Sequence, residues 1–147
     1  MKRIIHWLKG KMLAMFSQPK VRSISMDPET LADISEMARG AHPKEMLAFL
    51  SSSGGNVNGH VSIDELQLQA YYASGDSASV MTSNLPMTTS IIGTVHSHPG
   101  GNTHPSEADR TLFRRFGYVH AIIGEPYRPQ DIRFYSKNGE QINVEIQ

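Results

Sequence analysis

The residues best suited to chemistry lie in one short stretch, where His96 and His98 are followed by Ser106 and Asp109. Two imidazole nitrogens and one carboxylate oxygen are ligands that zinc commonly takes, and three protein ligands leave its fourth coordination position open. An open position on zinc is typical of hydrolysis rather than of structural support. The spacing therefore predicts one zinc ion per chain, held by His96, His98 and Asp109.

The sequence around these residues predicts the elements that bring them together. Residues 91–95 form an apolar run that predicts a strand ending at His96, and residues two apart on a strand point to the same face. Residues 105–116 predict a helix that begins at Pro105, on which Ser106 and Asp109 are three apart and share a face. Each part alone is weak, because His-x-His pairs occur at surfaces and Ser-x-x-Asp often only caps a helix. The combination is much more specific.

Beyond the motif, residues 21–147 predict a single α/β domain with a mainly antiparallel or mixed sheet and two main helices. The first helix is expected to begin at Asp27 and to close at Gly40, and Asn138-Gly139 is a strong hairpin signal. Residues 45–52 are almost continuously apolar, which predicts a strand buried on both faces. The other expected strands are residues 21–25, 61–72, 118–123, 132–135 and 141–146, while residues 74–87 are polar and irregular apart from a short extended candidate near 79–81.

Composition narrows the function classes. The 147 residues suit one domain, and 39% hydrophobic with 19% charged residues suits a soluble globular protein. Fourteen basic residues balance fourteen acidic ones, which argues against nucleic acid as a default partner. The chain has no cysteine, so disulfides, cysteine-ligated zinc and a thiol nucleophile are excluded, and the seven histidines are the plausible soft-metal ligands.

Residues 1–20 differ from the rest of the chain. Residues 1–16 carry four basic residues and no acidic ones, and Ile4, Leu8 and Met12 recur at helical spacing. Basic residues interrupt this run, so it is neither a secretory apolar region nor long enough to span a bilayer, and we expect a cytoplasmic protein. We favour packing of this segment on its own domain or on a second subunit, with peripheral contact to an anionic membrane as the alternative.

A hydrolytic site also needs a carboxylate close to the metal that can take a proton and return it to the leaving group. Glu45, at the start of the expected buried strand, is the best candidate for this base. The alternative is that Glu45 is an exposed acid at a strand start. Glu65, Glu107 and Glu125 are competitors for the same role.

These residues carry a resemblance to a known family. His96-Ser97-His98-Pro99, then Ser106 and Asp109, with Glu45 some fifty positions upstream, resemble the JAMM motif of catalytic MPN domains (JAB1/MPN/Mov34 metalloenzymes). The chain is most similar to small stand-alone prokaryotic and archaeal members, over about residues 22–147. The resemblance implies an α/β fold like that of the cytidine deaminases. Deamination itself is excluded, because those enzymes need cysteine ligands to zinc.

The resemblance also implies a role for each matching residue. His96, His98 and Asp109 match the zinc ligands, Glu45 matches the general acid/base that deprotonates the attacking water, and Ser106 matches the hydroxyl that stabilises the oxyanion. At the N-terminus of a helix, Ser106 is also where the helix dipole favours negative charge.

The activity implied by the resemblance is that of a zinc-dependent peptidase or isopeptidase. Its substrate would be a ubiquitin-like protein joined through its C-terminal Gly-Gly, or a sulfur-carrier protein with a C-terminal extension. Residues 74–87 are expected either to offer a sheet edge for that tail or to be an ordinary surface loop. A non-catalytic MPN scaffold is an alternative that the complete motif disfavours. A RadC-like, DNA-repair-associated protein is another, disfavoured by the balanced charge and the lack of a preceding helix-hairpin-helix region.

Overall fold

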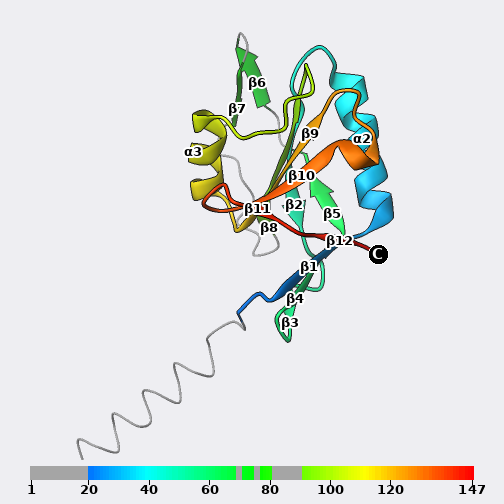
Figure 1. Cartoon of the computed structure of the whole chain (residues 1–147), viewed down its shortest axis with the longest axis vertical. Coiled ribbons are helices and arrows are strands. Elements are labelled where there is room, and N and C mark those ends of the chain that lie inside the picture. The colour runs from blue at the N-terminus through cyan, green and yellow to red at the C-terminus, as the bar shows by residue number, and fades with distance from the viewer. Residues whose placement is uncertain (1–19, 69–70, 75–76, 81–90) are drawn as a thin grey trace, which may run out of the picture.

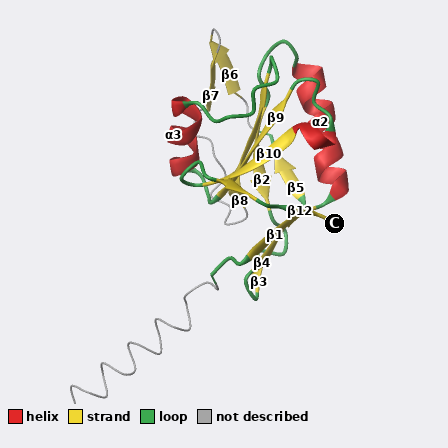
Figure 2. Cartoon of the chain, viewed as in Figure 1, coloured by secondary structure: helices red, strands yellow, loops and turns green. Residues whose placement is uncertain are grey.

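A central six-stranded sheet with one helix on each side forms the body of the protein (Figures 1 and 2). The structure is a computed structural model that describes residues 20–68, 71–74, 77–80 and 91–147. The sheet is mixed, because β8 and β9 pair in parallel while the other neighbours pair antiparallel. In spatial order its strands are β11 (Gln141–Ile142), β10 (Ile132–Ser136), β9 (Val119–Gly124), β8 (Ile91–His98), β2 (Leu47–Ser51) and β5 (Glu65–Gln67).

The two helices flank this sheet. Figure 2 shows α2 (Pro28–Ala41) on one side of the strands and α3 (Glu107–Arg115) on the other. A second, smaller sheet brings together the first and the last strands of the described chain. Its strand order is β12 (Glu145–Ile146), β1 (Ser23–Met26), β4 (His60–Ile63) and β3 (Asn56–Val57). In the described part of the chain, the predicted α/β domain with a mixed sheet and two main helices is therefore confirmed.

Helix α2 begins where the sequence predicts and ends slightly later. Asp27 is its N-cap and accepts a hydrogen bond from the Thr30 backbone N–H at 3.0 Å. The predicted end at Gly40 is wrong, because Gly40 lies within the helix and Ala41 is its last residue. The helix stops before Pro43, since a proline disfavours the helical conformation of the residue that precedes it.

Two of the predicted strands are each divided between sheets. Residues 61–72 were expected to form one strand, but Asp64 separates β4 from β5, and β6 (Tyr71–Ser74) follows as part of a third sheet. At this point the Asp64 carboxylate accepts a hydrogen bond from the Ser53 backbone N–H at 2.8 Å. Residues 141–146 divide in the same way into β11 and β12. The hairpin at Asn138-Gly139 is confirmed, with Gly139 at a φ of 80°.

The sheet separates two unlike faces. The α2 face holds the main apolar core, in which Ile34 of the helix packs over Val95 and Ile123 of the central strands, all three fully buried. The α3 face carries a much smaller apolar cluster of Phe113, Ile122 and Tyr135. Because alternate residues of a strand point to opposite faces, Thr94, His96 and His98 of β8 share this second face with His120 of β9.

Parts of three predictions, those for residues 1–20, 61–72 and 74–87, lie beyond the described residues. The segment of residues 1–20 is outside them except for Lys20. Of residues 74–87, the structure describes the end of β6 and the strand β7 (Ser77–Val80), which pair antiparallel as a hairpin. Strand β7 overlaps the extended stretch expected near residues 79–81, in a segment otherwise expected to be irregular. No helix in the described part is long and apolar enough to cross a membrane.

Replacing Gly93 with alanine should strongly destabilise the fold. A Cβ at Gly93 would lie 1.5 Å from the Val119 carbonyl oxygen, so β8 and β9 would have to separate. Overpacking of this kind costs about 3 kcal/mol of unfolding free energy or more when the clash is with backbone. Gly40→Ala is the matched control, because a Cβ there meets nothing within 4 Å, and alanine favours a helix by about 0.5–1 kcal/mol. Urea unfolding of both variants tests this, and equal midpoints would contradict it.

Candidate metal centre

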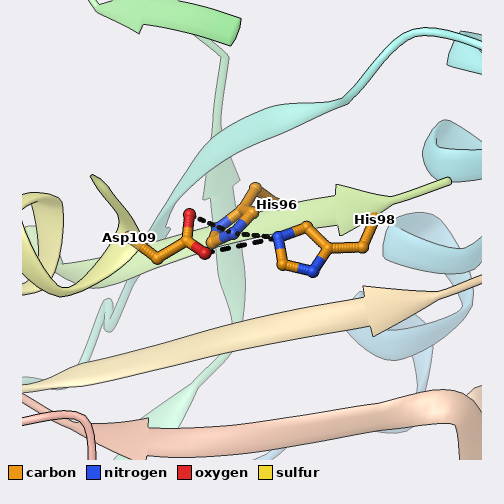
Figure 3. Close-up of side chains that lie close together, drawn as sticks. All are labelled: His96, His98 and Asp109. Carbon is orange, nitrogen blue, oxygen red and sulfur yellow. Dashed lines mark hydrogen bonds and ion pairs between the residues drawn. The ribbon is translucent and has the colours of Figure 1, made fainter. Parts of the chain in front are cut away.

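His96, His98 and Asp109 come together at the end of β8 that faces α3. The two histidines are two apart on β8 and point to the same face, while Asp109 lies in the first turn of α3 (Figure 3). Asp109 Oδ1 is 3.0 Å from His96 Nε2, and Asp109 Oδ2 is 3.4 Å from His98 Nε2. The two Nε2 atoms are 3.1 Å apart. The structure therefore brings together the three residues that the spacing predicts as metal ligands.

The donor atoms fit a tetrahedral ion. Ligands at zinc distances of 2.0–2.2 Å are separated by about 3.3–3.6 Å at tetrahedral angles, close to the three separations of 3.0–3.4 Å. His98 Nδ1–H donates to the Asn102 carbonyl at 2.6 Å, so the lone pair of His98 is on Nε2, facing the site. Lone pairs from two imidazoles and a carboxylate at this spacing repel one another unless a cation or a proton lies between them.

Ser106 is the N-cap of α3 rather than its second residue. The predicted helix start at Pro105 is wrong, because Ser106 has extended backbone angles (φ −72°, ψ 174°) and the helix begins at Glu107. Ser106 Oγ accepts from the Asp109 backbone N–H at 3.2 Å, and Asp109 Oδ2 accepts from the Ser106 N–H at 2.6 Å. Capping uses only the acceptor capacity of the hydroxyl, so the exposed Ser106 O–H is still available as a donor.

Glu45 lies beside His98, although it precedes β2 instead of starting it. Leu47 pairs with His96, and the contact continues one step outward, because the Ser97 N–H donates to the Met46 carbonyl at 2.9 Å. The Met46 N–H in turn donates to Ser97 Oγ at 2.8 Å. Two positions beyond the Leu47–His96 pair, Glu45 falls opposite His98, and directly opposed residues in antiparallel strands point to the same face. Glu45 is half-buried.

The three competing glutamates are placed less well. Glu65 pairs with Ser51, at the end of β2 away from the histidines. The Glu107 side chain is 82% exposed and forms an ion pair with Arg114 at 3.4 Å. Glu125 is close to the site, but its carboxylate accepts a hydrogen bond from the Gly100 N–H at 2.9 Å.

The charges of the site are strongly coupled. Burial alone would raise the pKa of Asp109, but hydrogen bonds with His96 and His98 hold it well below its usual range. The hydrogen bond with Asp109 raises the pKa of His98 above 6.5, with burial opposing and the Glu45 charge adding a smaller contribution. Asp109 is therefore a carboxylate at neutral pH, as a metal ligand must be.

Comparison with known proteins agrees with this geometry. A family model described as prokaryotic homologs of the JAB domain matches residues 27–137. The chain belongs to this family. Over 139 residues the JAB chain is 30% identical to a Haloferax volcanii protein named Probable metalloprotease, a match that covers 91% of this chain and 84% of that one.

Solved structures show the same relationship. A JAB1/MPN domain protein from Archaeoglobus fulgidus is 34% identical, with a TM-score of 0.65 over 83% of this chain and 97% of its own. A structure described as JAMM, a metalloprotease-like zinc site in the proteasome and signalosome, is 33% identical, with a TM-score of 0.65 over 86% and 99% of the two chains. The resemblance deduced from the motif is confirmed, and this JAB chain is a member of a metalloprotease family.

Some residues that support the JAB site were not predicted. His120 is fully buried, stacks on Phe113 at 4.3 Å between ring centroids, and contacts Thr94 Oγ1 through Nδ1 at 2.8 Å. Burial lowers its pKa to about 4, so it adds no positive charge behind the ligands. The only sequence signal was a histidine within an apolar strand, which does not distinguish a supporting residue from a core residue.

Lowering the pH should release zinc from the JAB site, because only neutral imidazole binds metal. The hydrogen bond with Asp109 raises the pKa of His98, which favours its protonated form and so strengthens the competition between protons and metal. In the metal-free protein, low pH has the opposite effect and stabilises the fold. There, a raised folded-state pKa contributes stability that is present below about pH 6.5 and is lost as the pH rises through the His98 pKa. Thermal unfolding from about pH 5 to 8, with and without zinc, should show the zinc-dependent gain in Tm shrinking toward pH 5. A gain independent of pH would contradict the prediction.

Proposed function

We propose that this chain is a zinc-dependent peptidase or isopeptidase that hydrolyses the amide bond after the C-terminal tail of a ubiquitin-like or sulfur-carrier protein. The observation that supports it best is the group of His96, His98 and Asp109 at zinc-compatible spacing, with Glu45 opposite His98. Its membership of a metalloprotease family supports the hydrolytic class.

The three ligand residues would hold the ion, and Glu45 and Ser106 would act on the substrate. When bound, zinc supplies Lewis acidity that makes water a competent nucleophile near neutral pH. Glu45 takes a proton from the attacking water and delivers it to the leaving amine, which is the general acid/base task. The Ser106 O–H donates to the oxyanion, aided by the positive end of the α3 dipole.

The substrate class is supported by the β6–β7 hairpin. An extended tail can add to an exposed strand, and main-chain hydrogen bonds then give affinity without requiring bulky side chains. In the described part of the chain, β6 and β7 pair only with each other. A diglycine tail suits such a site because glycines leave space for close backbone approach.

Incubation with tail-linked reporters tests the proposal. Ubiquitin-like and sulfur-carrier proteins would be joined through their diglycine tail to lysine, either by the α-amine or by the ε-amine, and cleavage would be followed by mass spectrometry. We expect cleavage directly after the tail, loss of cleavage with a zinc chelator, and recovery when zinc is restored. A reporter lacking the final two glycines is the matched control. Tight binding of the intact conjugates without cleavage would favour the scaffold alternative.

A further inference from the structure

We propose that the turn from Gly124 to Tyr127 is a brace, meaning that it fixes the loop after His98 relative to the segment that carries Glu45. We also propose that Tyr127 is a positioning residue for Glu45. This inference rests on the proposed function in one respect, that Glu45 is the base. The turn follows β9, whose last residue, Gly124, pairs with His98. It therefore leaves the sheet beside the metal ligands.

One side of the turn contacts the loop that follows His98. The Glu125 N–H donates to the His98 carbonyl at 3.2 Å, and the Glu125 carboxylate accepts from the Gly100 N–H at 2.9 Å. A Cβ at Gly124 would lie 2.8 Å from the Gly101 carbonyl oxygen, so the turn and the loop pack backbone to backbone. The same loop carries the Asn102 carbonyl that orients the His98 ring.

The other side of the turn contacts the segment that carries Glu45. The Tyr127 hydroxyl is 3.0 Å from His42 Nδ1, and the two rings meet edge to face with centroids 5.9 Å apart. Arg39 donates to the Tyr127 carbonyl at 3.1 Å. His42 and Arg39 lie at the end of α2, three residues or more before Glu45. These contacts therefore fix the N-terminal end of the segment that carries Glu45.

The backbone conformation of Tyr127 indicates that contacts with surrounding residues hold it in place. Tyr127 is 3% exposed and has a φ of 65°, a left-handed conformation that is costly for a residue with a side chain. Such conformations persist where surrounding contacts determine them, and they concentrate at functional sites. The Glu45 charge contributes to raising the pKa of Tyr127, after burial and Glu125, so the hydroxyl and the carboxylate are close enough to interact.

Glu45 needs such an anchor because it is outside β2 and is not held by the sheet ladder. On its C-terminal side, Met46 is held to Ser97 by two hydrogen bonds. On its N-terminal side, the described contacts run through Lys44, whose N–H donates to the Ala41 carbonyl at 2.9 Å, and through the His42–Tyr127 pair. Because small displacements of a catalytic group can reduce rates by up to about a hundredfold, the pair should affect turnover more than substrate binding.

The test uses full-length zinc-loaded protein and the reporters described above. Tyr127→Phe, which removes only the hydroxyl, and His42→Ala should each lower kcat about tenfold while KM changes less than about twofold, and the double variant should be no worse than either single variant. His42→Asn, whose amide can occupy the place of Nδ1, should recover most of kcat. Zinc content should be unchanged in all of them. Tyr118→Phe, at the opposite end of β9, is the matched control and should have wild-type kcat.

A second measurement decides the brace without any hydrolysis. Amide hydrogen exchange over residues 43–46 should be faster in Tyr127→Phe and His42→Ala than in the wild type or Tyr118→Phe, while exchange over residues 91–98 stays the same. Unchanged exchange over residues 43–46 would overturn the brace, whatever the activity. If the wild-type protein hydrolyses the reporters, and the Tyr127→Phe and His42→Ala variants exchange faster but keep the wild-type kcat, the positioning role of Tyr127 is overturned. If wild-type protein cleaves no reporter, the proposed function fails and exchange alone decides the brace.

Discussion

Glu45→Gln should keep one zinc ion per chain and lower kcat by about 10²–10⁴-fold. Glutamine has nearly the same shape as glutamate, but it cannot take a proton from water and pass it to a leaving amine. Glu45 is not among the three residues whose donor atoms converge, so the ligand set is intact in this variant. The loss should therefore appear in turnover rather than in metal content or substrate affinity.

Zinc content and steady-state kinetics on the same preparation check this result. Glu107→Gln is the matched control, because the same chemical change is made on an 82% exposed side chain in the first turn of α3. It should leave kcat within about twofold, since a surface ion pair such as that with Arg114 contributes little. Turnover close to wild type in Glu45→Gln would show that another group is the base.

Asp109→Ala should lose both the zinc and the hydrolysis. The substitution removes the carboxylate that lies 3.0 Å from His96 Nε2 and 3.4 Å from His98 Nε2, leaving two neutral ligands. It also removes the acceptor for the Ser106 N–H, so the start of α3 is weakened by about 1 kcal/mol. Any stabilisation that zinc gives to the native state should disappear with the site.

Asp109→Asn separates the two losses. An asparagine amide oxygen can still accept from the Ser106 N–H, but it is a weaker zinc ligand because it carries no charge. Zinc content should therefore fall in both variants, while the metal-free Tm should fall clearly only in Asp109→Ala. Zinc analysis that finds one ion per chain in both variants would contradict the ligand set.

Sequence periodicity predicted the elements that are specified locally. The N-cap at Asp27, the buried strand around Phe49 and the hairpin at Gly139 each depend on residues within a few positions of one another, and all three are present. The metal ligands could also be predicted from the sequence, because His96 and His98 are on one strand and Asp109 lies in the first turn of the helix that follows the connecting loop.

Longer-range features could not be predicted in the same way. The placement of Glu45 depends on the antiparallel pairing of β2 with β8, whose paired residues are 40 to 49 positions apart, and periodicity does not specify pairing. The division of residues 61–72 occurs at Asp64, whose hydrogen-bond partner Ser53 is eleven positions away, and both residues look like ordinary polar surface positions in the sequence. Tyr127 gave no signal, since its partners His42 and Arg39, at the end of α2, are 85 and 88 positions away.

The unequal faces of the central sheet have a consequence for how this protein can change over generations. Most of the buried apolar side chains lie on the α2 side, whereas the ligands and the small cluster around Phe113 lie on the other. Substitutions that abolish the chemistry therefore fall mainly outside the apolar core that contributes most to stability. A descendant that has lost its histidines can still present the same outline to a binding partner, so inert relatives can arise from such a domain without first having to survive unfolding.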